Sequence, residues 1–329
     1  MMRLKYLYDN RELVMNILDY WEYDEKDIDI LDQYRISSNA VYPFSNHGKI
    51  QLLRFSPVQE KLPEDIKAEL EYIKFLKEEK YPVLELVASN NNKEMELIDT
   101  SWGKYSAVVF KRVKGVRLDK VKLNGEIIYN LGCSLGRLHK LSNKFVPKNH
   151  NRISYIKQLE WMDNVLSDYE NENFAKKEVE ILKKELGGLD KNNTNFGLIH
   201  YDFDLDNVFW DEQTNTFNVI DFDDAVYHWY VMDIILTIQK ISESLPDNNK
   251  LDVEKLLIKG YKTQYMIDDD IYKKTEIFKR YGFLYSYIRC LRSLSEPIDN
   301  KPEWMINLIN TVKEHMESSS RYFGKEIVS

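Results

Sequence analysis

Residues 200–210 read HYDFDLDNVFW, and a second acidic run, VIDFDDA, follows at 219–225. The first run carries three aspartates and one asparagine within a few positions. Carboxylates crowded so closely repel one another unless a cation or a proton offsets their charge. The sequence therefore indicates a site around Asp202, Asn207 and Asp221 that binds either a cation or a proton.

The spacing of these three residues favours a phosphoryl-transfer site. Asp221 ends the apolar run TFNVID (216–221), so its carboxylate projects from the end of an expected strand. Facing it, Asn207 supplies a second oxygen, and one or two protein oxygens suit Mg²⁺, which also binds phosphate oxygens and water. Asp202 is then free to accept a proton from an attacking hydroxyl. A base, a metal-binding Asn and a metal-binding Asp are the parts of a kinase site.

Composition indicates an ordinary globular protein, and 329 residues are enough for two lobes around a cleft. A net charge of −8 argues against nucleic-acid binding, which needs basic surface. The start of the chain lacks a signal-peptide core, and no apolar run reaches the roughly 18 residues of a membrane span. Two cysteines, Cys133 and Cys290, suggest a reducing compartment without structural disulfides. We expect a cytoplasmic protein with neither nucleic-acid nor membrane partners.

The first third of the chain predicts a small lobe rich in strands. Apolar residues recur at helical spacing over 11–21, and Pro63 opens a second helix with an apolar stripe. The segment 37–56 predicts a hairpin around the turn residues at 45–48. Further strand candidates are LELVAS (84–89), EMELID (94–99) and YSAVVF (105–110).

The rest of the chain predicts a mainly helical lobe. Helices are expected over 126–142, 152–170 and 174–186, and again from about Met232 onward. Two short apolar runs, 196–200 and 216–221, interrupt them, and we expect the two to pair as strands around the turn at 211–215. The overall prediction is an α+β fold.

Several motifs in a fixed order resemble the aminoglycoside phosphotransferase and choline kinase superfamily, which is related to the protein kinases. The matching stretches are HxDxxxxN at 200–207, IDFDD at 220–224, GCSLGRLHK at 132–140, YSAVVFKRVKG at 105–115 and RFSPVQEKLPEDIKAELEYIKFL at 54–76. An ordered set is more specific than any single motif. The resemblance implies a two-lobed protein-kinase-like fold, with a small β-rich N-lobe that carries a helix (1–110). A hinge and a helical catalytic and acceptor lobe follow (111–329).

By this resemblance, Asp202 is the catalytic base, and Asn207 and Asp221 hold Mg²⁺. Arg54 stands where most kinases have the phosphate-binding lysine, and Glu69 stands in the place of its helix partner. Strand alternation places Arg54 on one face with apolar neighbours, and a buried arginine needs a carboxylate partner. We therefore predict an ion pair between Arg54 and Glu69.

The resemblance also implies where a nucleotide binds. Phe110, Lys111, Arg112 and Val113 correspond to the hinge whose backbone meets adenine. Two polar residues occupy the place of the phosphate-covering loop, which has little glycine here; they are Ser38 and Asn39. ATP is the expected cofactor together with Mg²⁺, and GTP stays open.

The acceptor is a hydroxyl of a small molecule, whose identity the sequence leaves open. Asp204, Asp223 and Asp224 flank the centre, and an acidic pocket would favour a cationic acceptor such as an amino sugar or an amino alcohol. Alternatively, these residues are ordinary surface positions of an acidic chain. A protein Ser/Thr kinase and a catalytically weak nucleotide-binding regulator are the other functions considered. The oligomeric state stays open.

Other residues in these motifs have simpler explanations. We expect His200 to be a structural histidine that hydrogen-bonds the loop, and His139 to be packed within its helix. The Trp229–Tyr230 pair is expected to belong to the core, since adjacent aromatics are more often core than a substrate platform.

Overall fold

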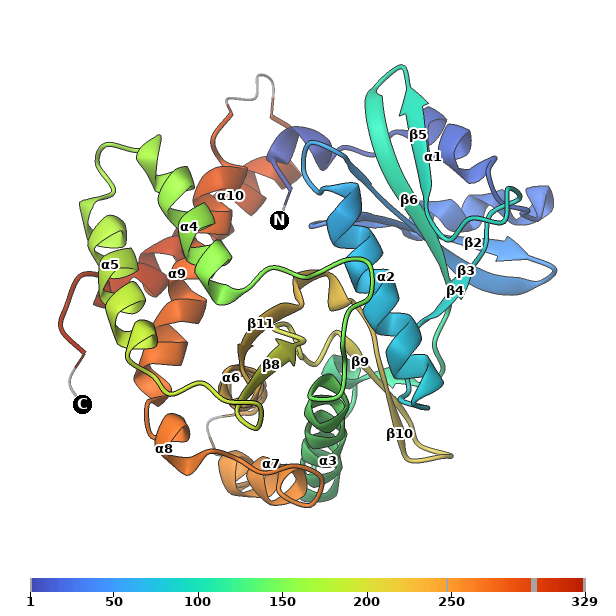
Figure 1. Ribbon diagram of the computed structural model, residues 1–329. Helices are drawn as coiled ribbons and strands as arrows, with labels where there is room; N and C mark the ends of the chain where they lie inside the picture. Colours follow the sequence, from blue (N-terminus) through green and yellow to red (C-terminus); the bar gives the residue numbers. More distant parts are fainter. Residues whose placement is uncertain (1, 247, 297–300, 328–329) are drawn as a thin grey trace.

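The computed structural model describes residues 2–246, 248–296 and 301–327. Its N-terminal part is built on a six-stranded antiparallel sheet of order β1-β2-β3-β6-β4, with β5 also paired to β6 (Figure 1). The strands are β1 (Arg35–Ile36), β2 (Ala40–Asn46), β3 (Lys49–Pro57), β4 (Glu85–Val87), β5 (Glu96–Thr100) and β6 (Gly103–Lys111). The predicted hairpin is confirmed, because β2 and β3 pair up to Asn46 and Lys49, on either side of the turn.

Two helices cover opposite faces of this sheet. Helix α1 (Arg11–Leu18) packs with Ala107 and Val109 of β6, and α2 (Pro63–Glu78) packs with Val108 and Phe110. Successive residues of a strand point to opposite faces of the sheet, which explains why alternate residues of β6 pack against different helices. A segment of 3₁₀ turns over Glu25–Gln33, which the sequence did not predict, runs beside β2.

Helices dominate the rest of the chain. They are α3 (Gly125–Ser142), α4 (Tyr155–Ser167), α5 (Asn173–Gly187), α6 (Val231–Ser244), α7 (Val253–Tyr261), α8 (Asp269–Tyr272), α9 (Thr275–Ser293) and α10 (Glu303–Ser319). In Figure 1 they lie below and to the left of the N-terminal sheet. None of the helices in the described ranges is long and apolar enough to cross a membrane. Both cysteines are free.

The predicted strand pair of 196–200 with 216–221 is wrong in its partners. β8 (Phe196–Ile199) pairs with β11 (Val226–Trp229), while β10 (Thr216–Val219) pairs with β9 (Val208–Asp211), which also pairs with β7 (Val116–Arg117). The turn at 211–215 is present, but it joins β9 to β10. Strands β9 and β11 are short and are flanked by the acidic loops. Their alternation of apolar and polar residues is therefore too brief to indicate a strand in the sequence.

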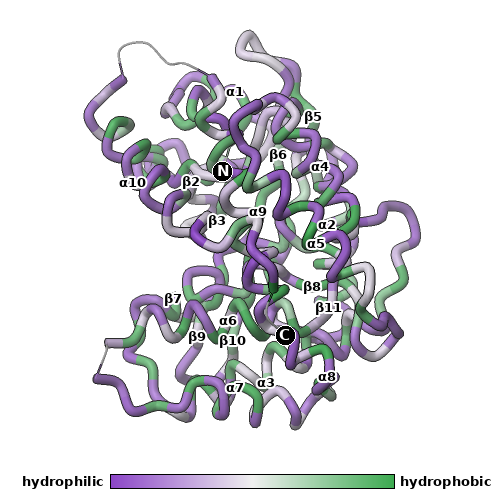
Figure 2. The backbone as a smooth tube through the Cα atoms, turned by 90° about the vertical axis from the view of Figure 1, so that its left-hand side faces the viewer, coloured by the Kyte–Doolittle hydropathy of each residue, from purple (hydrophilic) through white to green (hydrophobic). Residues whose placement is uncertain are grey.

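Helices α3 and α7 lie against each other at close range. A Cβ on Gly132 of α3 would lie 2.1 Å from the carbonyl oxygen of Leu257, and one on Gly260 of α7 would lie 1.9 Å from that of Tyr129. Figures 1 and 2 both place the pair at the bottom, on the side of β9 and β10 and away from β5. Gly132, the first of the two glycines of the GCSLGRLHK motif, is therefore needed for the close packing of these helices.

Candidate active site

Arg54 of β3 faces α2, because it pairs across the sheet with Val108, which packs against that helix. Its Nη1 and Nη2 donate to the two carboxylate oxygens of Glu69 at 2.8 and 2.6 Å, so the predicted ion pair is present. Burial alone would lower the pKa of Arg54, but the charge of Glu69 raises it above its ordinary value. The guanidinium also lies 5.1 Å from the ring of Phe110 and 3.8 Å from Asp221 Oδ1. The pair therefore extends from the N-terminal sheet to the acidic loops.

The loop after β8 is anchored by Asp233, at the start of α6. Its carboxylate accepts from the backbone N–H of His200 at 2.9 Å and of Tyr201 at 2.7 Å. His139 of α3 binds the same carboxylate at 3.0 Å through Nε2. Tyr201 has φ of 71°, a left-handed conformation that costs a non-glycine residue about 1 kcal/mol or more. Sequence reasoning missed Asp233, since nothing local distinguishes it from the other acidic residues of the chain.

Asp202, Asn207 and Asp221 lie together, as the spacing predicted. Asn207 Nδ2 donates to Asp202 Oδ2 at 2.9 Å and to the Asp202 carbonyl at 3.0 Å. The N–H of Ile220 donates to the Asn207 carbonyl at 2.9 Å, which fixes Asn207 next to the residue that precedes Asp221. Asp221 itself has φ of 62°, so it leaves the strand in a left-handed conformation. Backbone held this way is often found at functional sites.

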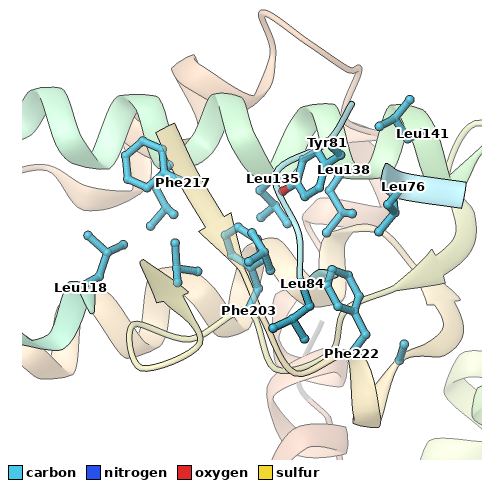
Figure 3. Close-up of a cluster of buried hydrophobic side chains, with 14 of the residues drawn as sticks. Leu76, Tyr81, Leu84, Leu118, Leu135, Leu138, Leu141, Phe203, Phe217 and Phe222 are labelled. Atoms are coloured by element: carbon cyan, nitrogen blue, oxygen red, sulfur yellow. The ribbon is translucent and has the colours of Figure 1, made fainter. Parts of the chain in front are cut away.

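Two phenylalanines hold these acidic residues in place. Phe203 follows Asp202, Phe222 follows Asp221, and both side chains are buried in the same apolar cluster as Leu84 (Figure 3). His200 packs 4.5 Å from the ring of Phe222, and its Nε2 lies 3.0 Å from the Ile220 carbonyl. His200 is thus the structural histidine that was expected, and burial lowers its pKa.

Burial and neighbouring charges set the protonation of the carboxylates. Burial, and then the charges of Asp224 and Asp221, raise the pKa of Asp202 to about 7. Burial and the charge of Asp223 raise the pKa of Asp221 to about 6. Asp223 differs: burial would raise its pKa, but the Lys61 ammonium holds it below its ordinary value. A carboxylate with a pKa near neutrality, such as Asp202, is suited to proton transfer.

The oxygens at this centre fit a magnesium ion that is shared with a phosphate. Asn207 uses its amide nitrogen on Asp202, so its amide oxygen is the atom left for a cation. Asp221 Oδ1 is buried without a hydrogen-bond partner in the described chain, although the side chain as a whole is 42% exposed. No cluster of three or more His, Cys, Asp or Glu suited to a metal occurs among the described residues. Few protein ligands, completed by phosphate and water, are typical of Mg²⁺.

Of the two predicted phosphate-covering residues, Asn39 contacts the acidic loop directly, and Ser38 is linked to it through Arg289. Asn39 Nδ2 donates to Asp223 Oδ2 at 3.2 Å, and Lys61 donates to Asn39 Oδ1 at 3.0 Å while it also pairs with Asp223. Ser38 Oγ accepts from Arg289 Nη2 at 2.9 Å. Lys61 and Arg289 were not identified from the sequence, because their partners are distant along the chain.

Two cavities meet at Asp224. The loop cavity, about 460 Å³, lies between the Asp202 loop and helices α6, α9 and α10. The lobe cavity, about 240 Å³, lies between Ser38, the start of α2, α4 and α9. Asp204 and Asp224 line the loop cavity, whereas Asp223 lines the lobe cavity and is bound to Lys61 there. The charged residues of the loop cavity are of both signs: Asp202, Asp204, Asp224, Glu243, Lys240, Lys279 and Arg289.

The expected hinge, Phe110 to Val113, spans the end of the sheet, because Phe110 and Lys111 are the last two residues of β6. Phe110 is buried, Lys111 pairs with Glu85, and the N–H of Arg112 donates to the Ile50 carbonyl at 3.4 Å. Just beyond, Gly115 has φ of 101°, and a Cβ there would lie 2.6 Å from the backbone of Trp210. Only glycine allows the chain to pass so close to β9.

Residues 37–255 match the phosphotransferase enzyme family. The chain belongs to this family, as the ordered motifs had indicated. Among curated relatives, it is 26% identical to Amicoumacin kinase of Bacillus subtilis (strain 168) over 219 residues, which are 64% of this chain and 63% of the relative. The matched part is therefore less than two thirds of that relative's length.

Solved structures support the same fold. The amicoumacin kinase hAmiN in complex with AMP-PNP, Ca²⁺ and Ami has a TM-score of 0.76 at 18% identity, over 98% of this chain and 97% of that one. A microcompartment-associated aminopropanol kinase has a TM-score of 0.66 at 19% identity, over 95% and 97%. Spectinomycin phosphotransferase with ADP and spectinomycin has a TM-score of 0.56 at 11% identity, over 95% of this chain and 98% of that one. The predicted α+β protein-kinase-like fold is confirmed.

Proposed function

We propose that the protein transfers the γ-phosphate of ATP, with Mg²⁺, to a hydroxyl group of a small molecule. The observation that carries this proposal is the convergence of Asp202, Asn207 and Asp221 opposite the buried pair of Arg54 and Glu69. A site without catalytic activity would have no physical need to keep these groups together. Bound AMP-PNP or ADP in related folds is consistent with a nucleotide cofactor.

In this proposal each residue has a defined role. Asp202 orients the acceptor hydroxyl and takes its proton, while Arg54, held by Glu69, binds a phosphate oxygen. Asn207 and Asp221 would hold Mg²⁺, which neutralises charge on the transferring phosphate when bound. Barrier lowering would come from positioning and charge neutralisation and not from a covalent intermediate.

Backbone and loop groups complete the proposed nucleotide site. The backbone of residues 110–113 meets the base, at a hinge between lobes 1–110 and 111–329. Ser38 and Asn39 cover the phosphates. GTP is an alternative donor, since the base would be bound by backbone groups.

The acceptor is proposed to be cationic and to occupy the loop cavity. This cavity reaches Asp202, and its other carboxylates include Asp204 and Glu243; Asp224 also lines it but is already paired with Arg289. An amino alcohol or an amino sugar would match these charges while presenting a hydroxyl. The named relatives act on amicoumacin or aminopropanol, or bind spectinomycin. Asp223 has no part in this proposal because it lies on the lobe cavity and is bound to Lys61.

A protein substrate fits this geometry less well. The loop cavity is bounded on its far side by His315, Ser318 and Ser319 of α10, so it encloses a small volume next to Asp202. A peptide acceptor needs an open groove instead. A catalytically weak regulatory protein would bind the nucleotide but would not transfer its phosphate. The experiments below measure nucleotide binding and phosphate transfer separately and so distinguish the two functions.

The first test is a thermal-shift titration with ATP, GTP and ADP, each with and without Mg²⁺. A ligand that binds only the folded state raises the melting temperature; at 100 times its Kd the gain is about 2.7 kcal/mol. A shift that depends on Mg²⁺ supports the nucleotide site and justifies screening amino sugars and amino alcohols. The absence of any shift at millimolar nucleotide would overturn the kinase proposal.

The second test is Asp202→Asn. The variant keeps the size and hydrogen bonds of the side chain but cannot accept the proton, so transfer should fall by about 10²- to 10⁴-fold. Nucleotide affinity, measured by calorimetry, should stay close to that of the wild type. Full turnover in this variant would show that Asp202 is not the base.

A further inference from the structure

Arg289 of α9 joins the two parts of the proposed site. Its Nη1 donates to Asp224 Oδ2 at 2.6 Å, and its Nη2 donates to Ser38 Oγ at 2.9 Å. The guanidinium lies 5.3 Å from the ring centre of Tyr285, one turn earlier on the same helix. Stacking on that ring and the bond to Asp224 orient the planar group toward Ser38.

The position of Arg289 coincides with the junction of the two cavities. It lines the loop cavity together with Asp202, and it lines the lobe cavity together with Ser38. If the proposed function holds, the terminal phosphate lies between the base Asp202 and the loop at Ser38. The guanidinium therefore borders the path of the transferred group.

Arg289 also has donors to spare. A guanidinium has five N–H groups, and its two hydrogen bonds within the described residues use one each of Nη1 and Nη2. Because the second bond is to a neutral hydroxyl, it is weaker than a bond to an anionic phosphate oxygen. Exchanging Ser38 for a phosphate would leave the bond to Asp224 intact.

We propose that Arg289 binds the γ-phosphate of the nucleotide and neutralises its charge during transfer, resting on the phosphotransferase function proposed above. An arginine that reaches the terminal phosphate lowers the barrier of phosphoryl transfer in other nucleotide enzymes by the same means. A purely structural arginine, joining Ser38 to α9, would not distinguish ATP from ADP.

The experiment compares AMP-PNP·Mg²⁺ and ADP·Mg²⁺ binding by calorimetry in the wild type, Arg289→Gln and Arg292→Gln. Arg292 is the matched control: it lies on the same helix, pairs with Glu60 at 2.9 Å, and lines only the lobe cavity of the two. Arg289→Gln should weaken AMP-PNP binding about 10- to 100-fold relative to ADP binding. Arg292→Gln should leave the ratio of the two affinities unchanged.

The outcomes separate this inference from the proposed function. A wild type that binds neither nucleotide would refute the proposed function itself. If the wild type binds both and Arg289→Gln weakens them equally, or weakens neither, the assignment of Arg289 to the γ-phosphate is overturned. Selective loss of AMP-PNP affinity supports it.

Arg289→Gln leaves Asp224 without its cation, which could prevent folding. In that case the double variant Asp224→Asn/Arg289→Gln replaces it and is compared with the wild type, because removing both partners leaves no unpaired charge at this partly buried position. The same selective loss of AMP-PNP affinity is expected in the double variant relative to the wild type. An unchanged ratio between them would likewise overturn the proposal.

Discussion

Glu69 and Glu178 are two buried carboxylates, each bound through both oxygens by one arginine. Glu69 binds Arg54 next to the proposed active site, whereas Glu178 of α5 binds Arg280 of α9, and this second pair lines neither cavity. Both glutamates are fully buried. Comparing the two ion pairs therefore distinguishes the contribution of a buried ion pair to stability from its contribution to nucleotide binding.

We expect Glu69→Gln and Glu178→Gln each to lose about 3–5 kcal/mol of unfolding free energy, because each leaves a buried arginine without its counter-charge. Urea denaturation measures this loss. Only Glu69→Gln should also weaken AMP-PNP binding, since only Arg54 is proposed to bind phosphate. Equal nucleotide affinity in the two variants would show that Glu69 is not needed to position Arg54 for phosphate binding.

At the same scale, one residue inside the HxDxxxxN motif has an unusual backbone conformation. Tyr201, between His200 and Asp202, has a φ of 71°, which glycine adopts without strain. The conformation is held by Asp233, whose two carboxylate oxygens accept from the backbone N–H groups of His200 and Tyr201. The sequence showed the motif, but the backbone geometry that the motif requires became visible only with its anchor.

At the scale of elements, helices α3 and α7 depend on glycines where they meet. Gly260→Ala would place a Cβ 1.9 Å from the Tyr129 carbonyl oxygen, and the helices must separate to accommodate it. We expect the free energy of unfolding of this variant to fall by about 3 kcal/mol or more. Thermal or urea unfolding measures it.

Gly187→Ala is the matched control for this prediction. Gly187 ends α5, and a Cβ there would meet nothing within 4 Å. Alanine is the better helix former, so this variant should be unchanged or more stable by up to about 1 kcal/mol. If Gly260→Ala were as stable as Gly187→Ala, close packing of α3 and α7 would not contribute to stability.

Strand pairing marks the limit of prediction at this scale. The β2–β3 hairpin was predicted because its turn joins the two partners directly. The partners of β8 and β10 were predicted wrongly, because β8 pairs with β11 across the whole acidic segment. A short apolar run indicates a strand, but it does not indicate which other strand it joins.

For the whole molecule, His228 of β11 makes stability depend on pH. It is fully buried among Tyr155, Trp229, Phe278 and Tyr281. Burial lowers its pKa from the ordinary 6.5 to about 3. Below pH 6.5 the unfolded chain binds a proton that the folded chain does not, so the stability from this residue falls as pH falls toward 3.

We therefore compare the wild type with His228→Phe, which cannot titrate, by urea denaturation at pH 7 and pH 5. The wild type should lose about 2 kcal/mol more than the variant over this interval. Other buried groups, including His200, titrate in both proteins and cancel in the difference. Parallel losses in the two proteins would show that His228 does not remain neutral in the folded state.

The sequence by itself determined the local features of this protein. Helix and hairpin positions, the inward phase of Arg54 and the spacing of Asp202, Asn207 and Asp221 all follow from residues that are neighbours along the chain. Periodicity and motif order record such neighbours directly. These features were enough to indicate the fold and the family.

Only the tertiary structure decided which distant residues complete the site. Asp233 anchors the loop, Lys61 neutralises Asp223, and Arg289 reaches both Ser38 and Asp224. Each contact joins segments that lie far apart in the chain, and its value depends on burial that packing creates. Charged residues make up 30% of the chain, and nothing in the sequence near Lys61, Asp233 or Arg289 indicates that these three lie at the site. Their roles therefore follow from the packing of the helices around the loop.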